Sequence, residues 1–185
     1  MKKSKAAVAT AAFFVVAPGT IVGVIPRLVT GWEFHRPLPH WEIAQVAGGA
    51  LVGVGLIPPV SAFVEFARAG GTPMPVAPTT RLVVSGFNRY LRNPMYFGLL
   101  SAIVGQALLF GSGRLLVYAA SAWGVTAGFV RWYEEPTLTR QFGADYDAYR
   151  RAVPAWWPRR RAWTPTDIPS VSDDGMQTRP KAGAP

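Results

Sequence analysis

The chain has 185 residues, of which 50% are hydrophobic and only 16% are charged, a low charged share for a soluble domain. A single domain of this size is too small to bury so many apolar side chains, so the composition favours a membrane protein. The absence of cysteine excludes disulfides, thiolate catalysis and metals bound by cysteine.

Four apolar stretches predict an all-α, polytopic membrane protein with about four transmembrane helices. They cover residues 6–25, 43–66, 95–110 and 115–132. The first two reach the ~20 residues that a spanning helix needs. We expect Pro18-Gly19 to loosen the first span and Pro58-Pro59 to kink or break the second. The last two are short, so we expect them to thin the bilayer or to hold one end below its surface.

The net charge of +9 suggests nucleic acid, but the placement of the basic residues favours a membrane. They concentrate before the first span, between the second and third, and after the fourth. The two other connections hold only Arg27, Arg36 and Arg114. This alternation fits the positive-inside rule with both termini cytoplasmic. We expect an integral protein of a bacterial inner membrane, with membrane lipids and no nucleic acid as partners.

The loop between the first two spans contains both histidines, His35 and His40, together with Trp32, Phe34 and Trp41. Two histidines five residues apart are a weak metal signal. Aromatic side chains are typical of the headgroup region of a bilayer. We therefore expect an interfacial loop and no metal.

An amphipathic cytoplasmic helix is predicted over residues 134–152, after the last span. Its apolar face contains Glu135, Leu138, Phe142, Tyr146 and Tyr149, which recur at steps of three and four. From residue 164 to 185 the chain is polar and rich in proline, and we expect it to be disordered. The predicted membrane domain is thus 1–163.

Two polar blocks flank the last two spans. The first runs from Asn88 to Gly98 and the second begins at Glu134-Glu135-Pro136. A tight turn at Gly111-Ser112-Gly113-Arg114 would fold these spans antiparallel and bring both blocks to the same membrane face. Charged residues at the end of a spanning helix pair are costly to place, which indicates a functional site.

The blocks contain groups that suit a zwitterionic ligand. Arg92 offers positive charge to a carboxylate, and Asn93 is expected to cap the helix that starts at Pro94. Glu134 and Glu135 suit ribose hydroxyls or a cation, while tyrosines can stack on a base or a sulfonium. S-adenosylmethionine combines these features. The alternative is that the arginines and tyrosines are membrane anchors and the glutamates are surface charges.

The order of these motifs resembles a known superfamily over residues 71–158. The residues that carry the resemblance are Gly86, Tyr90, Arg92-Asn93-Pro94-Met95-Tyr96-Phe97-Gly98, Glu134-Glu135-Pro136, Leu138, Phe142-Gly143, Tyr146, Tyr149, Val153-Pro154 and Pro158. In the identity, order and spacing of these residues the chain resembles the isoprenylcysteine carboxyl methyltransferase / phospholipid methyltransferase superfamily of integral-membrane enzymes. The chain departs from it at Asn93, where the superfamily often has histidine, so a role that needs an imidazolium is not available.

The resemblance implies a methyltransferase that binds S-adenosylmethionine at the cytoplasmic ends of the last two spans. It assigns to the cofactor Tyr90, Arg92, Asn93, Tyr96, Gly98, Glu134 and Glu135. It assigns to the substrate Tyr146, Tyr149 and Arg150, with Glu135 and Arg150 as the catalytic residues.

The expected reaction is methyl transfer to a lipophilic small molecule or lipid in the membrane. A carboxylate acceptor needs no base, whereas an amine does, and Glu135 is the nearest candidate. Carboxylate O-methylation and amine N-methylation both stay open. A non-catalytic membrane protein that keeps the fold for lipid binding or assembly is the alternative. A small transporter is disfavoured, because the charges gather at one face.

Overall fold

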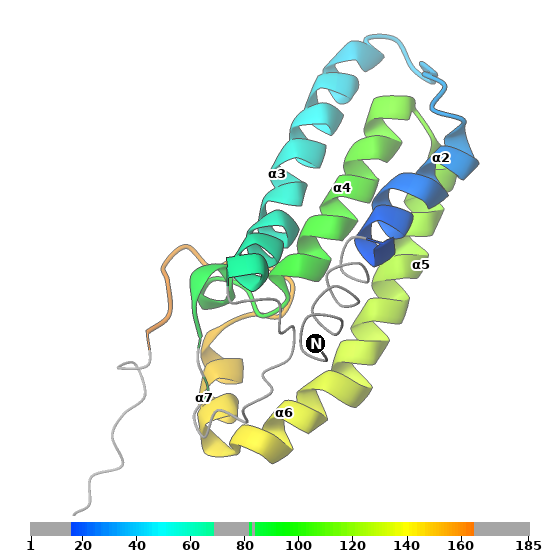
Figure 1. Cartoon of the computed structure of the whole chain (residues 1–185). Coiled ribbons are helices and arrows are strands. Elements are labelled where there is room, and N and C mark those ends of the chain that lie inside the picture. Colours follow the sequence, from blue (N-terminus) through cyan, green and yellow to red (C-terminus); the bar gives the residue numbers. More distant parts are fainter. Residues whose placement is uncertain (1–15, 69–81, 83, 165–185) are drawn as a thin grey trace, which may run out of the picture.

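The computed structural model describes residues 16–68, 82 and 84–164, and every regular element within them is helical (Figure 1). The elements are η1 Thr20–Val24, α2 Ile25–Thr30, α3 Trp41–Arg68, η2 Gly86–Arg89, α4 Pro94–Phe110, α5 Gly113–Phe129, η3 Val130–Glu134, α6 Glu135–Phe142 and α7 Ala144–Ala152. The predicted helical class is confirmed. Residues 6–15 of the first predicted span and 165–185 of the predicted tail lie outside the described residues.

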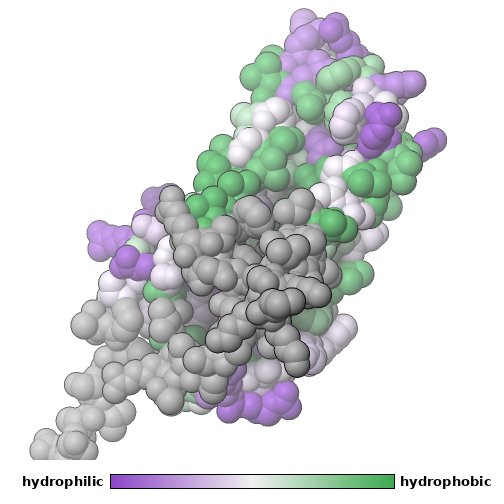
Figure 2. All heavy atoms as spheres, in the orientation of Figure 1, coloured by the Kyte–Doolittle hydropathy of each residue, from purple (hydrophilic) through white to green (hydrophobic). Residues whose placement is uncertain are grey.

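One helix of the described part, Trp41–Ala62 within α3, is long and apolar enough to cross a membrane. Val16–Thr30 and Pro94–Phe110 are shorter apolar helices. The number of four spans therefore stays a prediction. Figure 2 shows hydrophobic residues along the middle of the bundle and hydrophilic residues at its two ends, the pattern that an apolar slab would require.

Close contact between α3 and the antiparallel α4 forms the centre of the bundle (Figure 1). Gly48 of α3 lies against Gly105 of α4, and Gly55 lies against Gly98. A Cβ atom on Gly55 would come within 2.8 Å of the Gly98 carbonyl oxygen, and one on Gly105 within 2.7 Å of the Gly48 oxygen. Small residues at these points let the two backbones touch, as expected for helices packed in a membrane.

The loop before α3 and the first turns of α3 cover the end of α4. The Trp41 indole donates a hydrogen bond to the Leu108 carbonyl (2.9 Å), the Gln45 amide donates to Leu109 (3.2 Å) and the His35 backbone N–H donates to Phe110 (3.1 Å). The last carbonyls of a helix have no partner within it, so these three bonds satisfy groups that would otherwise be costly to bury.

The first described helix runs to Thr30, five residues beyond its predicted end at residue 25, and contains a π turn at η1. Pro26 has no N–H, which leaves the carbonyls of the preceding turn without a partner in the helix. The Gln106 amide donates to the Val22 carbonyl (2.8 Å) and the Tyr118 hydroxyl to the Ile21 carbonyl (3.1 Å). Side chains of α4 and α5 thus stabilise the loosened turn that Pro18-Gly19 and Pro26 produce.

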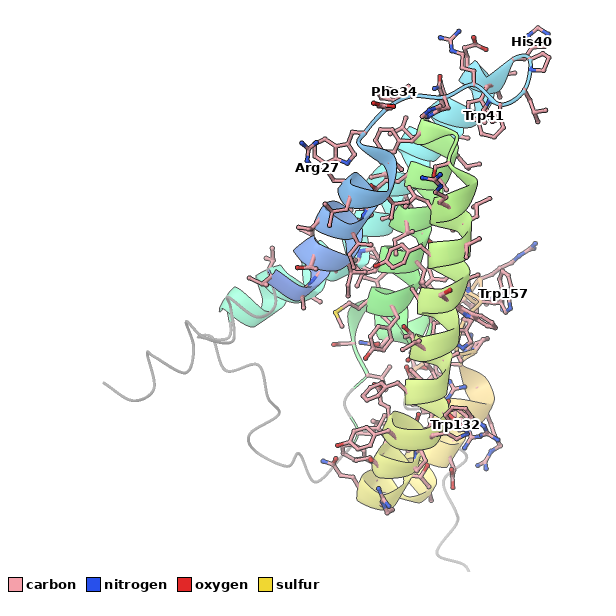
Figure 3. The ribbon with its side chains drawn as sticks, turned by 90° about the vertical axis from the view of Figure 1, so that its right-hand side faces the viewer. Arg27, Phe34, His40, Trp41, Trp132 and Trp157 are labelled. Atoms are coloured by element: carbon pink, nitrogen blue, oxygen red, sulfur yellow. The ribbon has the colours of Figure 1, made fainter. Side chains whose placement is uncertain are left out.

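Helix α3 continues through Pro58 and Pro59 to Arg68. Figure 3 shows its last part, drawn in teal, turned away from the axis of the bundle. Two missing N–H donors and the bulk of the rings explain this kink. The kink places the turn after Pro59 over the start of α4.

Helix α5 does not stop near residue 132 but continues through the π turn η3 into α6 (Figure 1). Pro136 follows η3 by two residues, as Pro26 follows η1. The predicted helix over 134–152 is divided into α6 and α7 at Gly143, whose backbone angles of φ 54° and ψ −126° suit only glycine. The predicted apolar face is nonetheless buried, because Tyr146 and Tyr149 pack with Val153 and Trp163.

Candidate functional site

The two polar blocks of the sequence meet where α4 begins and α6 begins. The Arg92 guanidinium Nη1 lies 2.5 Å from Oε1 of Glu135, and their side chains are only 12% and 8% exposed. The turn at Gly111 allows this, because its left-handed φ of 64° ends α4 and reverses the chain. The expectation that the turn brings the blocks together is confirmed.

Glu135 is surrounded by arginines. Besides Arg92, the Arg150 Nε lies 3.5 Å and the Arg131 Nη1 3.9 Å from its second carboxylate oxygen. Both carboxylate oxygens of Glu135 therefore face positively charged side chains. Arg150, which the resemblance assigns to the substrate and to catalysis, has its guanidinium on Glu135 and lines none of the cavities described below.

The segment after α7 fastens the first block in place. Backbone hydrogen bonds run from Arg92 N–H to the Pro154 carbonyl (2.9 Å), from Arg159 N–H to Tyr90 (3.0 Å) and from Trp163 N–H to Arg89 (2.9 Å). The Arg89 Nε returns a bond to the Trp163 carbonyl at 2.8 Å. This segment therefore keeps Arg92 beside Glu135.

Asn93 also contacts the segment that follows α7. It precedes α4 as expected, but its side chain makes no capping hydrogen bond. Instead Nδ2 donates to the Ala155 carbonyl at 3.2 Å, and the residue is buried. Asn93 is thus the N-cap residue of α4 as expected, but the prediction that its side chain caps the helix is wrong: the amide is oriented towards a carbonyl 62 residues further along the chain.

A cavity of about 300 Å³ opens beside this cluster. Three parts of the chain line it: the kinked end of α3, the turn before α4 together with the first turn of α4, and Glu134. The lining residues are Pro58, Ser61, Ala62, Ser85, Gly86, Phe87, Asn88, Arg92, Asn93, Pro94, Met95, Tyr96 and Glu134.

Sequence reasoning missed the contribution of α3 and of residues 85–87 to this cavity. The signal is Pro58-Pro59, which predicts a kink or a break in the second span but does not by itself predict what the turned helix end covers. A kink that turns one helix end across another creates a wall, and here that wall carries the small polar side chain of Ser61.

Two buried polar atoms beside the cavity have no hydrogen-bond partner among the described residues: Nε of Arg92 and Oε2 of Glu134. Burial raises the pKa of the Glu134 carboxyl above its usual range, although the hydrogen bond from Tyr96 acts in the opposite direction. Buried polar atoms are normally paired, so these two distinguish Arg92 and Glu134 from the other residues that line the cavity.

Tyr146 and Tyr149, assigned by the resemblance to the substrate, belong to the packed cluster with Val153 and Trp163. The Tyr149 hydroxyl donates to the Asn88 carbonyl at 2.7 Å. Burial raises the pKa of both phenols, so both stay neutral near neutral pH. They line a small cavity of about 30 Å³ together with Arg92 and both glutamates, and they do not line the 300 Å³ cavity.

Gly98 and Tyr90 lie outside the 300 Å³ cavity and line a separate apolar groove between α3 and α4. The structure gives Gly98 a packing role, because a Cβ atom there would overlap α3 at Gly55 and Pro59. The groove has a volume of about 310 Å³ and shares Pro58, Phe87 and Pro94 with the polar cavity.

A second apolar groove of about 640 Å³ lies between α4 and α5. It shares Leu51, Phe97 and Ser101 with the first groove and ends at Trp123, Trp156 and Trp157. Trp157 is 76% exposed, and Figure 3 shows it projecting from the side of the bundle. Apolar surface thus extends from the wall of the polar cavity to the flank of the molecule.

These features define an all-helical protein with a charged cavity at one end of an apolar bundle. The chain matches the phospholipid methyltransferase family over residues 43–145 and belongs to that family. Membership points to a membrane-associated methyltransferase that acts on a phospholipid or another lipophilic substrate. The comparisons with curated proteins and with solved structures gave no match.

Proposed function

We propose that the protein transfers a methyl group from S-adenosylmethionine to a lipophilic acceptor in the membrane. The observation that carries the proposal is the pair of unpartnered buried atoms, Arg92 Nε and Glu134 Oε2, at a cavity between two apolar helices. A donor and an acceptor of opposite charge, held in one cavity, suit a ligand that carries both a carboxylate and a positive charge.

The side chains around the cavity fit this cofactor. Arg92 would bind its carboxylate through Nε, while Nη1 remains on Glu135. Asn93 and Tyr96 would contact its polar atoms, and Glu134 offers a carboxylate to a positive charge of the cofactor or of the acceptor. When bound, S-adenosylmethionine supplies a methyl group on a positively charged sulfur. The volume of about 300 Å³ lies at the lower end of the range for ligand pockets.

Glu135 has a different role in this proposal from the one expected of it. Its carboxylate is occupied by arginines, so it would orient Arg92 and not remove a proton. The apolar grooves that share walls with the cavity would hold the hydrocarbon part of the acceptor. Orientation of the two reactants and exclusion of water would provide most of the rate acceleration.

Binding of radiolabelled S-adenosylmethionine to the detergent-solubilised protein tests the proposal. Arg92→Lys keeps a positive charge for Glu135 but removes the Nε donor from the cavity. Loss of a hydrogen bond to a charged group costs ~1.5–3 kcal/mol, so affinity should fall roughly tenfold or more. Arg36→Lys is the matched control, since Arg36 lies in the loop before α3 and forms an exposed ion pair with Glu42 at the start of that helix. Absence of saturable binding to the wild-type protein would exclude the methyltransferase proposal.

A further inference from the structure

Three consecutive arginines, Arg159, Arg160 and Arg161, follow α7 and take no part in the site described above. None of them lines the polar cavity or either apolar groove, and none forms an ion pair with a described residue. Arg160 and Arg161 are exposed, whereas Arg159 is half-buried and its Nη1 has no hydrogen-bond partner among the described residues. The segment therefore carries three positive charges that no acidic side chain of the described part neutralises.

Hydrogen bonds hold this segment against the turn before α4. The Arg159 N–H donates to the Tyr90 carbonyl at 3.0 Å. The Trp163 N–H donates to the Arg89 carbonyl at 2.9 Å, and Trp163 is buried. Because α4 is an apolar helix, the arginines are fixed where the apolar bundle ends, and α6 and α7 extend the molecule beyond this level (Figure 1).

The residues just before the arginines form an apolar surface. Trp156 and Trp157 line the large groove between α4 and α5, and Pro158 lines the smaller groove between α3 and α4. The ring of Trp156 packs edge to face on Trp123 of α5, with 6.3 Å between the ring centroids. Trp157 is largely exposed and projects from the side of the bundle (Figure 3). An exposed tryptophan beside basic residues is typical of the headgroup region of a bilayer.

We propose that residues 156–161 bind an anionic phospholipid at the membrane surface. Its phosphate would lie against the arginines, and its hydrocarbon chains would lie on the flank of the bundle around Trp157. This site lies outside the polar cavity, and the bound lipid does not react there. The inference therefore does not depend on the proposed function.

Charge and apolarity together favour an anionic phospholipid over other ligands. A guanidinium group presents several N–H donors in one plane and can bind two phosphate oxygens at once. A zwitterionic headgroup would also bring an ammonium group towards the arginines, where like charges repel. A soluble polyanion such as a nucleic acid would neutralise the arginines but leave the apolar surface of Trp157 in water. A lipid with net negative charge satisfies both parts of the segment.

Binding of such a lipid should also stabilise the protein. A partly buried charge without a partner is unfavourable, and an anion near Arg159 would compensate it. The Arg159 N–H bonds to Tyr90, so a lipid at the arginines would hold the segment on the turn before α4. A ligand that binds only the folded protein raises its melting temperature by mass action.

Titration of the detergent-solubilised full chain with phosphatidylglycerol tests the inference, and diacylglycerol with the same chains is the uncharged comparison. The wild-type protein should bind phosphatidylglycerol at least tenfold more tightly. The double variant Arg160→Gln/Arg161→Gln should lose roughly twentyfold in affinity for phosphatidylglycerol, because each arginine near anionic lipid strengthens binding by about fivefold. Arg140→Gln/Arg151→Gln removes the same charge from exposed positions of α6 and α7 and should retain the affinity. Equal losses in the two double variants would overturn the inference.

Two water-soluble probes separate a lipid from other anions. Glycerol phosphate carries the phosphate without chains, and a short single-stranded oligonucleotide carries many phosphates. Both should bind at least tenfold more weakly than phosphatidylglycerol. Trp157→Ser should weaken binding of phosphatidylglycerol and leave that of glycerol phosphate unchanged. If either soluble probe bound as tightly as the lipid, the segment would be a general anion site and the proposal would fail.

Arg159→Gln provides a variant whose stability should depend on the lipid. In uncharged detergent its melting temperature should equal or exceed that of the wild-type protein, because an unpaired charge is removed. Added phosphatidylglycerol should raise the melting temperature of the wild-type protein and raise that of the variant less. Thermal unfolding with and without the lipid measures both effects. A wild-type melting temperature that does not respond to phosphatidylglycerol, or an equal rise in the variant, would contradict the inference.

Discussion

Asn93 illustrates how a residue can be located correctly and still act through an unexpected partner. Its position before Pro94 predicted the start of α4, which the structure confirms. Its amide, however, joins the first polar block to the segment after α7 through the Ala155 carbonyl. A cap through Oδ1 is worth only ~1 kcal/mol, which is comparable to the bond from Nδ2 to Ala155, so the tertiary contact can decide how the amide is oriented.

Substitutions at Asn93 should separate this contact from simple packing. Asn93→His keeps an N–H donor near Ala155 and should retain both the melting temperature and cofactor binding. Asn93→Leu leaves the partly buried Ala155 carbonyl without its partner, which costs up to ~1–3 kcal/mol, and should lower the melting temperature in detergent. Membrane yield should be normal, since insertion depends on the apolar run after Pro94. Equal melting temperatures for the Leu variant and the wild-type protein would show that the Asn93 bond is dispensable.

The two glutamates should respond oppositely to loss of charge. Glu135→Gln leaves Arg92 buried without its counter-charge, and breaking such a pair typically costs ~3–5 kcal/mol. Glu134→Gln removes a partly buried carboxylate that has no cationic partner among the described residues, so the ligand-free variant should be at least as stable as the wild-type protein. Thermal unfolding at neutral pH in detergent measures both. Equal destabilisation by the two substitutions would mean that Glu134 has a cationic partner in the ligand-free protein.

The same comparison has a defined pH dependence. Burial raises the pKa of Glu134 above its ordinary value of 4.5, so the folded protein binds this proton more tightly than the unfolded chain. The unfavourable contribution of Glu134 is thus absent at low pH and grows as pH rises through 4.5 and then through the raised pKa. The stability difference between Glu134→Gln and wild type should therefore widen with increasing pH.

At the scale of elements, glycine contacts at two levels decide how α3 and α4 pack. Gly48 and Gly55 are separated by seven residues, as are Gly98 and Gly105, so the antiparallel helices touch twice along one side. This contact sets the axis from which the end of α3 turns at Pro58-Pro59. The wall of the polar cavity therefore depends on a contact made deeper in the bundle.

Gly55→Ala should weaken this contact, because its Cβ atom would lie 2.8 Å from the Gly98 carbonyl oxygen. Gly53→Ala is the matched control on the same helix, where nothing lies within 4 Å of the added atom. Alanine favours a helix over glycine by about 1 kcal/mol, so the control should melt at the same or a higher temperature. A Gly55 variant that behaves like the control would argue against close packing of α3 and α4.

At the scale of the whole molecule, the polar cavity and the apolar grooves occupy one end and one flank of the bundle. The end with the site carries Arg92, Arg131, Arg150 and Arg159, whereas the other end carries Arg27, Arg114 and Arg36, the last of which pairs with Glu42. Figure 3 shows Phe34, His40 and Trp41 at one end of the bundle, Trp132 towards the other end and Trp157 near mid-height. Phe34 and Trp41 at one end and Trp132 towards the other agree with two membrane surfaces.

Reporter fusions test the predicted orientation of the chain. Fusions at residue 78 and at the C terminus should report the same, cytoplasmic side, because basic residues gather there. A fusion at residue 36 should report the opposite side. If residues 36 and 78 reported one side, the four-span topology would be incorrect.

The large apolar groove should determine which chain lengths are accepted. Ala120→Phe adds a ring at a position that lines the groove, whereas Val117→Phe adds one nearby on α5 at a position that is 68% exposed and outside it. The first variant should favour acceptors with shorter chains, and the second should keep the wild-type preference. The measurement is kcat/KM for a series of acceptors that differ only in chain length. An identical series for both variants would place the hydrocarbon chain elsewhere.

The sequence by itself determined the helical class, the antiparallel turn at Gly111 and the buried face of Tyr146 and Tyr149. These features depend on periodicity and backbone conformation, which act over a few residues and can be recognised locally. The meeting of Arg92 with Glu135 followed from the same turn.

Only the tertiary structure decided which glutamate is neutralised, which carbonyl receives the Asn93 amide and which part of α3 closes the cavity. Each depends on contacts between residues far apart in the chain. Adjacent residues in a helix point about 100° apart, so Glu134 and Glu135 enter different surroundings although their local sequence is the same. The residues that surround them therefore pair Glu135 with arginines and leave Glu134 without a cation among the described residues.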